Sequence, residues 1–386
     1  MHLNRAAAKP QAADGADTAG GGRGPQQGVA SPGLEPKAAD RPLLPPMKFL
    51  KLELPRPASG HLEVFDELKG LAIILVVLYH FGGAIGWNNT LHGDLGVDMF
   101  VILSGAGLAF GSRYENARSF LFRRLLRIAP TYWIVLTLFC VCNTYILQLH
   151  YGPFDILVHY LGIQGFFGDV YGMSINDSFW FITLILSLYV LYCVCHPLMG
   201  SPGRLLLAGM AISVAVALAF FYTGQAGMFS HLGLRLPGFF IGILIGQLLR
   251  EGRLEIGFGW PLALALLLIS YVPYTQGVIF YTAIVALALM GAYVFGWKSL
   301  VPPRLEEPAS RTLRFLGNHS LEIFLIHQPL MRNYNTYLQA RFLGNVHPSV
   351  GSIEFGMMIA LAVAVYASFE LRRVMGRLTP GAGPAR

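Results

Sequence analysis

Long apolar runs separated by short polar breaks occupy the chain from Leu68 onward. A helix that crosses a bilayer needs about 20 predominantly apolar residues, and most of these runs approach that length. The pattern predicts spans near 68–86, 95–111, 129–149, 179–197, 205–222, 233–249, 257–273, 278–297, 315–331 and 350–371. A further run, 154–168, is shorter and interrupted by glycine, so hydropathy alone does not place it.

The distribution of Lys and Arg decides the topology. If 154–168 does not span and the N-terminus is cytoplasmic, the inner loops collect Arg113, Arg118, Arg123, Arg124, Arg127, Arg204, Arg250, Arg253, Lys298, Arg304, Arg311, Arg314, Arg372, Arg373 and Arg377. The outer loops then carry only Arg332 and Arg341, with Arg235 just inside the outer end of a helix. The positive-inside rule therefore favours ten spans with both termini in the cytoplasm. Segment 154–168 is then interfacial or re-entrant on the outer side.

Composition agrees with this pattern. The chain is 54% hydrophobic and 13% charged, with a mean hydropathy of +0.53, whereas soluble domains carry about 25% charged residues. This excludes a water-soluble fold and predicts an all-α, polytopic membrane helix bundle of the inner (plasma) membrane. The net charge of +7 is explained by topology, so we expect the lipid bilayer as a partner and no nucleic acid.

Three regions follow from composition. Residues 1–50, rich in Ala, Gly and Pro, are expected to form a disordered cytoplasmic extension because they cannot bury enough apolar surface. Residues 60–375 form the transmembrane domain, and 376–386 form a cytoplasmic tail. Two C-x-C pairs lie inside apolar runs, where residues two apart on a helix point to nearly opposite faces. They predict packing, and we expect no metal site.

Lys69 and His80 are the first candidates for chemistry. They are eleven residues apart in the first span, about three turns, so they share a helix face and lie about 16 Å apart along the axis. Lys69 is at the predicted cytoplasmic boundary and His80 near the bilayer midplane. An ionisable group at that depth indicates a pathway or a site. The alternative is a neutral histidine hydrogen-bonded within the bundle.

The second and third spans add further polar groups. Asp98 is expected near the outer edge and Ser104 at the depth of His80. Asp98 could orient an imidazole, bind a sugar hydroxyl, or be a solvated carboxylate at a helix N-terminus. Arg124 and Arg127 share a face at the cytoplasmic entry of the third span. Their guanidinium groups suit phosphate, although basic residues beside a span are also ordinary orientation signals.

Two later segments complete the set. Trp180 opens the fourth span at its outer end, where interfacial aromatics are expected. The segment FLGNHSLEIFLIHQPL carries Glu322 and His327, which are five residues apart and not obviously a pair. A buried glutamate in a membrane helix again indicates a function or a polar partner.

Taken together, these motifs resemble the membrane-bound acyltransferase family 3, which includes O-acetyltransferases of bacterial surface polysaccharides. The resemblance covers roughly residues 60–375, with lysine where the family usually has arginine in the first span. It rests on Lys69 with His80, Gly96 to Gly105, Arg124 with Arg127, Pro130 and Tyr132, then Trp180, and Leu316 to His327.

The resemblance implies an acyl-CoA donor, expected to be acetyl-CoA, and a hydroxyl acceptor on a glycan. Lys69, Arg124 and Arg127 would bind the donor phosphates. His80 would be the general base on the acceptor hydroxyl, or would form a transient acyl-histidine. The supporting or acceptor-side residues would be Asp98, Ser104, Trp180, Glu322 and His327.

Two other functions are compatible with the residues alone. In a transporter, His80 and Glu322 would relay protons or bind a substrate at the midplane. The third possibility is a non-catalytic assembly partner. Many transporters are built from repeated halves, and no clear repeat is visible in this chain.

Overall fold

The structure is a computed structural model that describes residues 62–378. It leaves out the segments 85–92, 112–113, 168–174, 224–227, 253–280, 298–301, 332–336, 338–340 and 342–349. The predicted extension 1–50, the predicted span 257–273 and most of the tail 376–386 lie outside the described residues.

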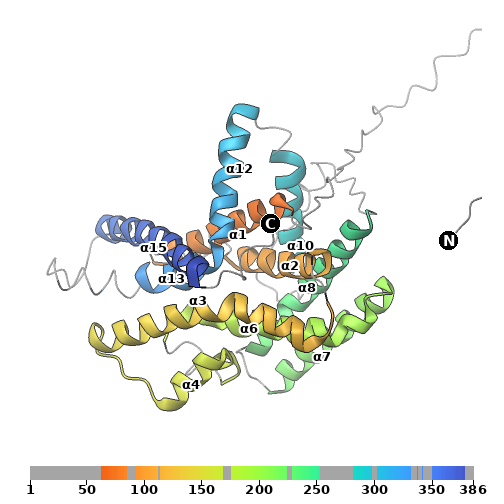
Figure 1. The fold of residues 1–386 in the computed structure, drawn as a ribbon, viewed down its shortest axis with the longest axis horizontal. Coiled ribbons are helices and arrows are strands. Elements are labelled where there is room, and N and C mark those ends of the chain that lie inside the picture. The colour runs from red at the N-terminus through yellow and green to blue at the C-terminus, as the bar shows by residue number, and fades with distance from the viewer. Residues whose placement is uncertain are drawn as a thin grey trace, which may run out of the picture. The chain divides into compact units, whose positions relative to one another are not determined.

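Every regular element in the described part is a helix, which confirms the predicted all-α class (Figure 1). The α-helices are α1 (Glu63–Ala84), α2 (Gly93–Gly111), α3 (Ala117–Tyr145), α4 (Pro153–Leu161), α6 (Trp180–Cys195), α7 (Pro202–Thr223), α8 (Met228–Glu251), α10 (Tyr281–Gly291), α12 (Pro303–Asn318), α13 (Ser320–Pro329) and α15 (Val350–Leu378). Short 3-10 helices cover Gln164–Phe167, Asp177–Phe179 and His196–Leu198, and a π-helix, Ala292–Trp297, follows α10.

Three helices in the described part are long and apolar enough to cross a membrane: Ala117–Tyr145, Trp180–Leu198 and His231–Glu251. Shorter apolar helices cover Leu95–Gly111, Leu207–Val216 and Ala283–Val294. The helices therefore indicate a membrane protein, while the number of ten spans and the sides of the termini stay predictions.

Two predicted spans have different boundaries. The third span was expected to begin near 129, but α3 begins at Ala117 because the Asn116 side chain caps it by accepting from the Ser119 amide at 2.8 Å. The arginine-rich segment is therefore helical. Over the predicted span 315–331 the helix is interrupted at His319 (φ −104°, ψ 12°) between α12 and α13, and the crossing of the membrane by these residues stays a prediction. The break falls at the polar residues Asn318, His319 and Ser320, with apolar residues on both sides.

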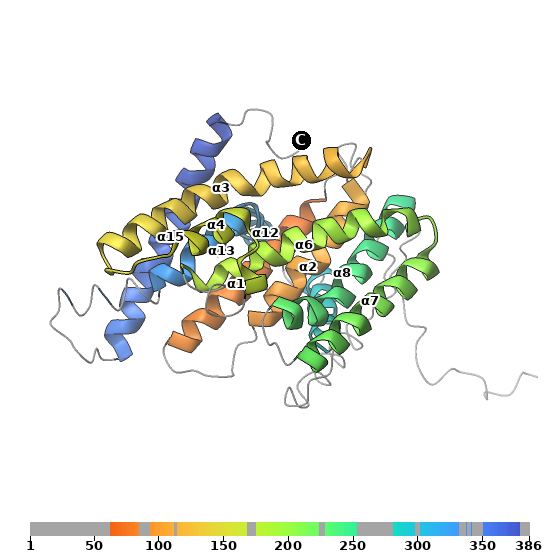
Figure 2. The same ribbon diagram turned by 90° about the horizontal axis from the view of Figure 1, so that it is seen from below.

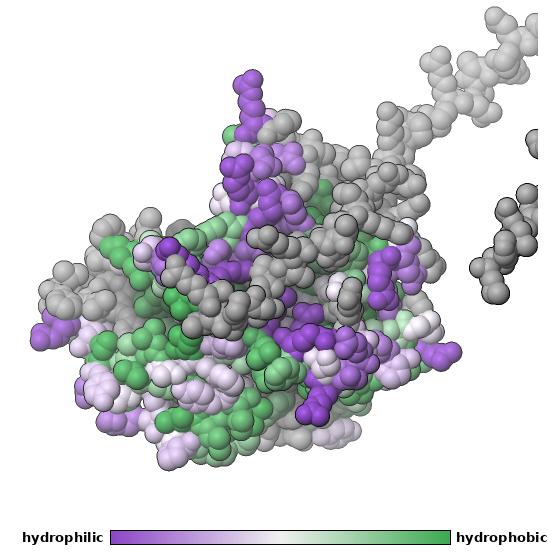
Figure 3. Space-filling view, viewed as in Figure 1, coloured by the Kyte–Doolittle hydropathy of each residue, from purple (hydrophilic) through white to green (hydrophobic). Residues whose placement is uncertain are grey.

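The charged helix α12 is anchored on α1. Figure 1 shows α12 projecting beside α1, and in Figure 3 hydrophilic residues gather along it. Arg314 of α12 contacts the buried Glu67 of α1 at 2.9 Å, and the Tyr293 hydroxyl donates to the same carboxylate at 3.0 Å. A Cβ at Gly317 would collide with the Asp66 carbonyl, so only glycine allows this approach. These contacts fix α13, which continues from α12, beside α1.

Glycines also set the distance between α2 and α8. A Cβ at Gly242 would collide with the Ile102 carbonyl, and one at Gly246 with the Ala106 carbonyl. Small residues at four-residue spacing let two membrane helices pack backbone to backbone. Figure 2 shows α2 and α8 together near the centre of the view. The close contact brings polar side chains of α2 and α8 within reach of one another.

Segment 154–168 begins with α4, a helix of nine residues. At 1.5 Å per residue it is about 14 Å long, which is much less than a bilayer core of about 30 Å. It ends at Gly162, whose φ of +70° is a conformation that favours glycine. The helix docks on α3 through hydrogen bonds from the Tyr132 hydroxyl to His159 O (2.7 Å) and from Trp133 Nε1 to Tyr160 O (2.9 Å). This length agrees with a segment that does not span.

Candidate active site

Two histidines from opposite ends of the sequence meet inside the bundle. His80, near the end of α1, has Nδ1 3.1 Å from Nε2 of His327 on α13, and their ring centroids are 4.9 Å apart. His327 is fully buried, whereas His80 is half-buried and has the Tyr79 ring edge-on to it at 5.3 Å. The pair thus joins a buried imidazole to one that is accessible from outside the bundle.

The neighbouring carbonyl groups assign the protons in this pair. His327 Nδ1 lies 2.9 Å from the carbonyl oxygens of both Ile323 and Phe324, which only accept, so this nitrogen carries the proton. His327 Nε2 is then an acceptor. His80 Nδ1 lies 3.0 Å from Val76 O, so it carries a proton that it shares between that carbonyl and His327 Nε2. When the His80 ring is neutral, its lone pair is therefore on Nε2, as a general base requires.

Helix α13 is held in place by contacts with the segment around Trp180. The Asn176 side chain donates to Leu325 O at 3.0 Å, and the Phe324 ring packs on Phe181 at 4.6 Å. Phe324 also lies edge-on to His327 at 5.9 Å. Packing therefore connects the histidine pair to the first turn of α6.

A second polar group surrounds Trp180, the first residue of α6. Asp98 of α2 forms an ion pair with Arg235 of α8 at 3.6 Å, and both side chains are less than 5% exposed. Asp98 is therefore not the solvated carboxylate that was one alternative. The Arg235 guanidinium lies over the Trp180 ring at 5.2 Å and donates to His231 Nδ1 at 3.3 Å. The His231 ring stacks on Trp180 at 4.3 Å.

Positive charges gather around Lys69 on α1. Lys69 binds Asp66, its neighbour one turn away, at 3.1 Å. Arg127 of α3 and Arg372 of α15 both lie within electrostatic reach of the Lys69 ammonium. The same two arginines act on the buried carboxylate of Glu322 on α13.

The two predicted donor arginines lie within electrostatic reach of one another but otherwise have different neighbours. The Arg124 guanidinium lies over the Phe120 ring at 5.4 Å and within electrostatic reach of the Tyr189 and Tyr192 hydroxyls of α6. Arg127 instead faces Lys69. The structure thus brings Lys69 and Arg127 together, with Arg124 on the adjacent surface of α3. Ser104 is half-buried on α2.

Sequence reasoning missed His231, Arg235 and Arg372 as members of these groups. One signal was available, because His231 and Arg235 are four residues apart in a largely apolar run and so share a helix face. Arg372 gave no such signal, since it resembles any basic residue that follows a span. Its position depends on how α15 packs against α3 and α13.

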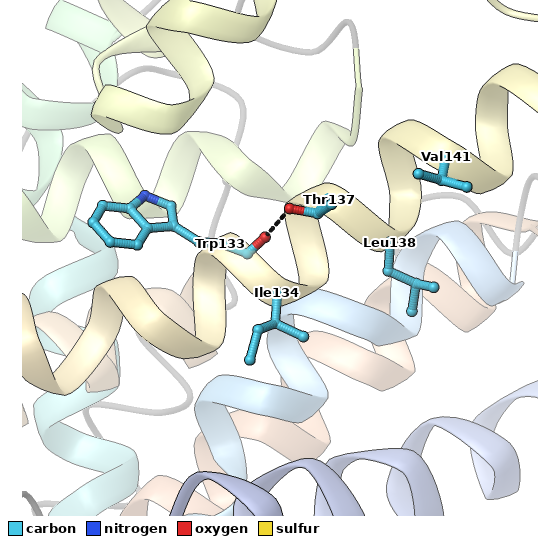
Figure 4. A pocket seen from close by; sticks show the side chains of 5 residues that line it. All are labelled: Trp133, Ile134, Thr137, Leu138 and Val141. Atoms are coloured by element: carbon cyan, nitrogen blue, oxygen red, sulfur yellow. Dashed lines mark hydrogen bonds between the residues drawn. The ribbon is translucent and has the colours of Figure 1, made fainter. Parts of the chain in front are cut away.

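A separate open depression lies on the exposed face of α3. It is lined by Trp133, Ile134, Thr137, Leu138 and Val141, and the Thr137 hydroxyl donates to Trp133 O at 2.7 Å (Figure 4). Its lining is almost entirely apolar and carries no ionisable group. A surface of this kind suits contact with lipid tails, and it does not form part of the candidate site.

Comparison with known proteins shows what the chain is similar to. An acyltransferase family 3 profile, described as "Acyltransferase domain", matches residues 63–369. A protein of Acidianus two-tailed virus named "Putative acetyltransferase ORF330" is 24% identical over 327 residues, which cover 80% of this chain and 89% of that protein. No solved structure matches the chain. The family match extends from α1 into α15 and includes the histidine pair and the Trp180 group.

Proposed function

The chain belongs to the membrane acyltransferase family 3, and from this premise we propose that it transfers an acetyl group from cytoplasmic acetyl-CoA to a glycan hydroxyl. The glycan is extracytoplasmic or lipid-linked. The protein is a multi-pass component of the inner (plasma) membrane, with ten spans and both termini in the cytoplasm. The segregation of Lys and Arg described above supports this topology.

His80 Nε2 is the proposed general base. It takes the proton of the acceptor hydroxyl while the hydroxyl oxygen attacks the thioester carbonyl carbon. The C–S bond then breaks and the CoA thiolate leaves. The His80 imidazolium gives up its proton, which yields free CoA thiol and restores the neutral base. Proton transfer of this kind contributes about 10²- to 10⁴-fold to the rate. The observation that carries this proposal is the pair of carbonyl contacts that place the protons on both Nδ1 atoms.

His327 is proposed to position His80. Its Nε2 accepts the hydrogen bond from His80 Nδ1 at 3.1 Å, which fixes the tautomer and the orientation of the ring. When His80 gains a proton at Nε2, this hydrogen bond becomes charge-assisted and therefore stronger. His327 thus acts through His80, as the orienting member of a catalytic triad acts through its histidine.

The two polar groups define donor and acceptor sides. On the proposed cytoplasmic side, Lys69, Arg124 and Arg127 bind the phosphates of CoA, and Glu322 supports them through its electrostatic interaction with Arg127. On the outer side, the polar and aromatic groups around Trp180, which include His231 stacked on its ring and the Asp98–Arg235 ion pair beside it, would bind the sugar. Ser104 is proposed to act with these acceptor-side residues. A route through the bundle would then lead from one group to the other past His80.

In the decisive experiment, the purified protein is reconstituted in vesicles and incubated with [¹⁴C]acetyl-CoA and a glycan acceptor. The expected result is release of free CoA thiol in equal amount to the acetyl group transferred, and loss of both in His80→Ala and His80→Gln. Glutamine keeps hydrogen-bonding capacity but cannot accept the proton. Near-wild-type transfer by the Gln variant would show that His80 is structural.

The transporter alternative makes an opposite prediction. A transporter would bind or move its solute without consuming the thioester, so acetyl-CoA would remain intact. An acyl-histidine intermediate is distinguished by rapid quenching, because label would appear on the protein before it appears on the acceptor.

A further inference from the structure

Arg127 and Arg372, from two different helices, act electrostatically both on Lys69 of α1 and on the buried Glu322 of α13. Lys69 comes from α1, Arg127 from α3 and Arg372 from α15, and each arginine lies within electrostatic reach of the Lys69 ammonium. They are 58 and 303 residues away from Lys69 in sequence, so folding alone assembles the group. Like charges repel, and such an arrangement is maintained at a cost unless an anion compensates it.

The neighbouring carboxylates compensate the cluster only in part. Asp66 binds Lys69 directly at 3.1 Å. Glu322 acts on both arginines, but it lies beyond ion-pair distance, and its buried Oε2 has no hydrogen-bond partner among the described residues. Within the described part of the chain, neither Arg127 nor Arg372 forms an ion pair or a hydrogen bond. Two guanidinium groups are therefore available to an external anion.

The packing of α15 directs Arg372 toward this group. Phe369, one turn earlier on the helix, lies 5.9 Å from the His319 ring and 6.3 Å from Phe315. Residues three apart share a helix face, so Arg372 faces α13 as Phe369 does. Its charge also acts on His319. The next residue, Arg373, is 57% exposed and pairs with Glu370 at 3.7 Å.

We propose that Arg372 binds a phosphate group of the acyl donor together with Lys69 and Arg127. This inference rests on the proposed acetyl-CoA function and adds a residue of α15 to the donor site. CoA carries a pyrophosphate and a 3′-phosphate, and guanidinium groups bind such oxygens bidentately. Three cations around one site match a ligand with several phosphate charges better than a ligand with a single carboxylate.

The experiment compares two donors that share the reacting thioester. Acetyl-CoA carries the phosphates, whereas S-acetylpantetheine has the same thioester arm and no phosphate. Arg372→Ala is expected to raise the KM for acetyl-CoA by about 10- to 100-fold and to leave kcat within about twofold. With S-acetylpantetheine, kcat/KM of the variant should equal that of the wild type.

Two further variants make the result specific. Arg372→Lys keeps the charge but loses the fork, so it should recover part of the affinity for acetyl-CoA. Arg373→Ala is the matched control, since it removes the neighbouring charge on the same helix and should leave the KM unchanged. Equal loss with both donors would mean that Arg372 only maintains the fold, and no loss with acetyl-CoA would mean that it does not touch the donor. Either result overturns the proposal.

A lipid headgroup offers the same phosphate chemistry, so the assays are run in two kinds of vesicle. In pure phosphatidylcholine, the increase in KM should persist if Arg372 binds the free donor. An increase that occurs only when phosphatidylglycerol is present would assign Arg372 to a headgroup and overturn the proposal.

Failure of the proposed acetyl transfer can be distinguished from failure of the Arg372 proposal. If the wild type transfers no acetyl group from acetyl-CoA, the function fails, whatever Arg372 does. Calorimetric titration with CoA itself separates the two, because weaker CoA binding by Arg372→Ala than by Arg373→Ala supports the phosphate contact without any turnover. Equal CoA binding by these two variants overturns it.

Discussion

His80 and His327 show how single residues carry the proposed chemistry. For two neutral rings, the Nδ1 to Nε2 distance of 3.1 Å and the backbone carbonyls at both rings leave one arrangement of protons. The sequence alone predicted that His80 mattered, because an ionisable residue at that depth is costly. It could not predict that His327 is the partner of His80. The two histidines are 247 residues apart in sequence, and no spacing within a single helix relates them.

Variants of His327 test its positioning role. His327→Ala should lower kcat by about 10²-fold with little change in the KM for acetyl-CoA, because His80 loses its orientation but the donor contacts remain. His327→Gln should retain more activity, since its side-chain oxygen can accept from His80 Nδ1. The measurement is steady-state acetyl transfer at saturating acceptor.

The double variant His80→Ala/His327→Ala shows whether His327 acts on the rate only through His80. If His327 acts only through His80, the His80→Ala/His327→Ala protein should be no slower than His80→Ala alone, since residues that act as one unit are strongly non-additive. Multiplied losses in the double variant would show that His327 contributes independently of His80.

Among whole elements, α4 illustrates what periodicity and charge could and could not predict. The charge distribution predicted that 154–168 does not span, and the short helix Pro153–Leu161 agrees with this. The docking of α4 on α3 was not predictable, because it depends on a tyrosine and a tryptophan that donate to backbone carbonyls of α4. The interruption at His319 coincides with the polar residues Asn318, His319 and Ser320, next to Gly317, where α12 approaches α1 closely.

The docking of α4 should weaken in acid. Burial lowers the pKa of His159, although the nearby Asp155 opposes this. Its Nδ1 donates to Asp155 O at 2.7 Å, and its buried Nε2 has no partner in the described part. The docked helix therefore favours the neutral ring, while the undocked helix takes up a proton below its ordinary pKa of about 6.5. The docking contribution is complete above that pH and is lost as the pH falls.

Hydrogen exchange measures this effect. After correction for the intrinsic rates, the amides of 156–161 should be protected at pH 7.5 and less protected at pH 5.5. His159→Gln should remove most of the difference, because glutamine does not titrate. Equal protection of the wild type at both pH values would contradict the prediction.

For the whole molecule, hydropathy and ordered motifs predict the fold class and the family, whereas the relative positions of the helices are not predictable from the sequence. Three helices are long and apolar enough to span, and in Figure 3 hydrophilic residues concentrate along α12. The fold class and the family could be predicted because they depend on hydropathy and on ordered motifs. The relative positions of the helices depend on close glycine contacts, such as Gly242 against Ile102, whose partners a sequence does not specify.

Reporter fusions test the orientation of the whole chain. Fusions after Gly168 and Gly224 should report the outer side, and a fusion after Pro302 the cytoplasm, as the Lys and Arg distribution requires. The readout is a pair of reporters, one active only outside the membrane and one only inside. An outer signal at Pro302, or an inner signal at Gly224, would exclude the ten-span arrangement.

The separation of 247 residues between His80 and His327 has a consequence for biosynthesis. At about 5 to 20 residues per second, the ribosome makes His327 roughly 12 to 50 s after His80. Throughout that interval the nascent protein contains the base but not the residue that orients it. The proposed catalyst therefore forms only in the last stage of translation, and a chain released early from the ribosome would lack the complete pair.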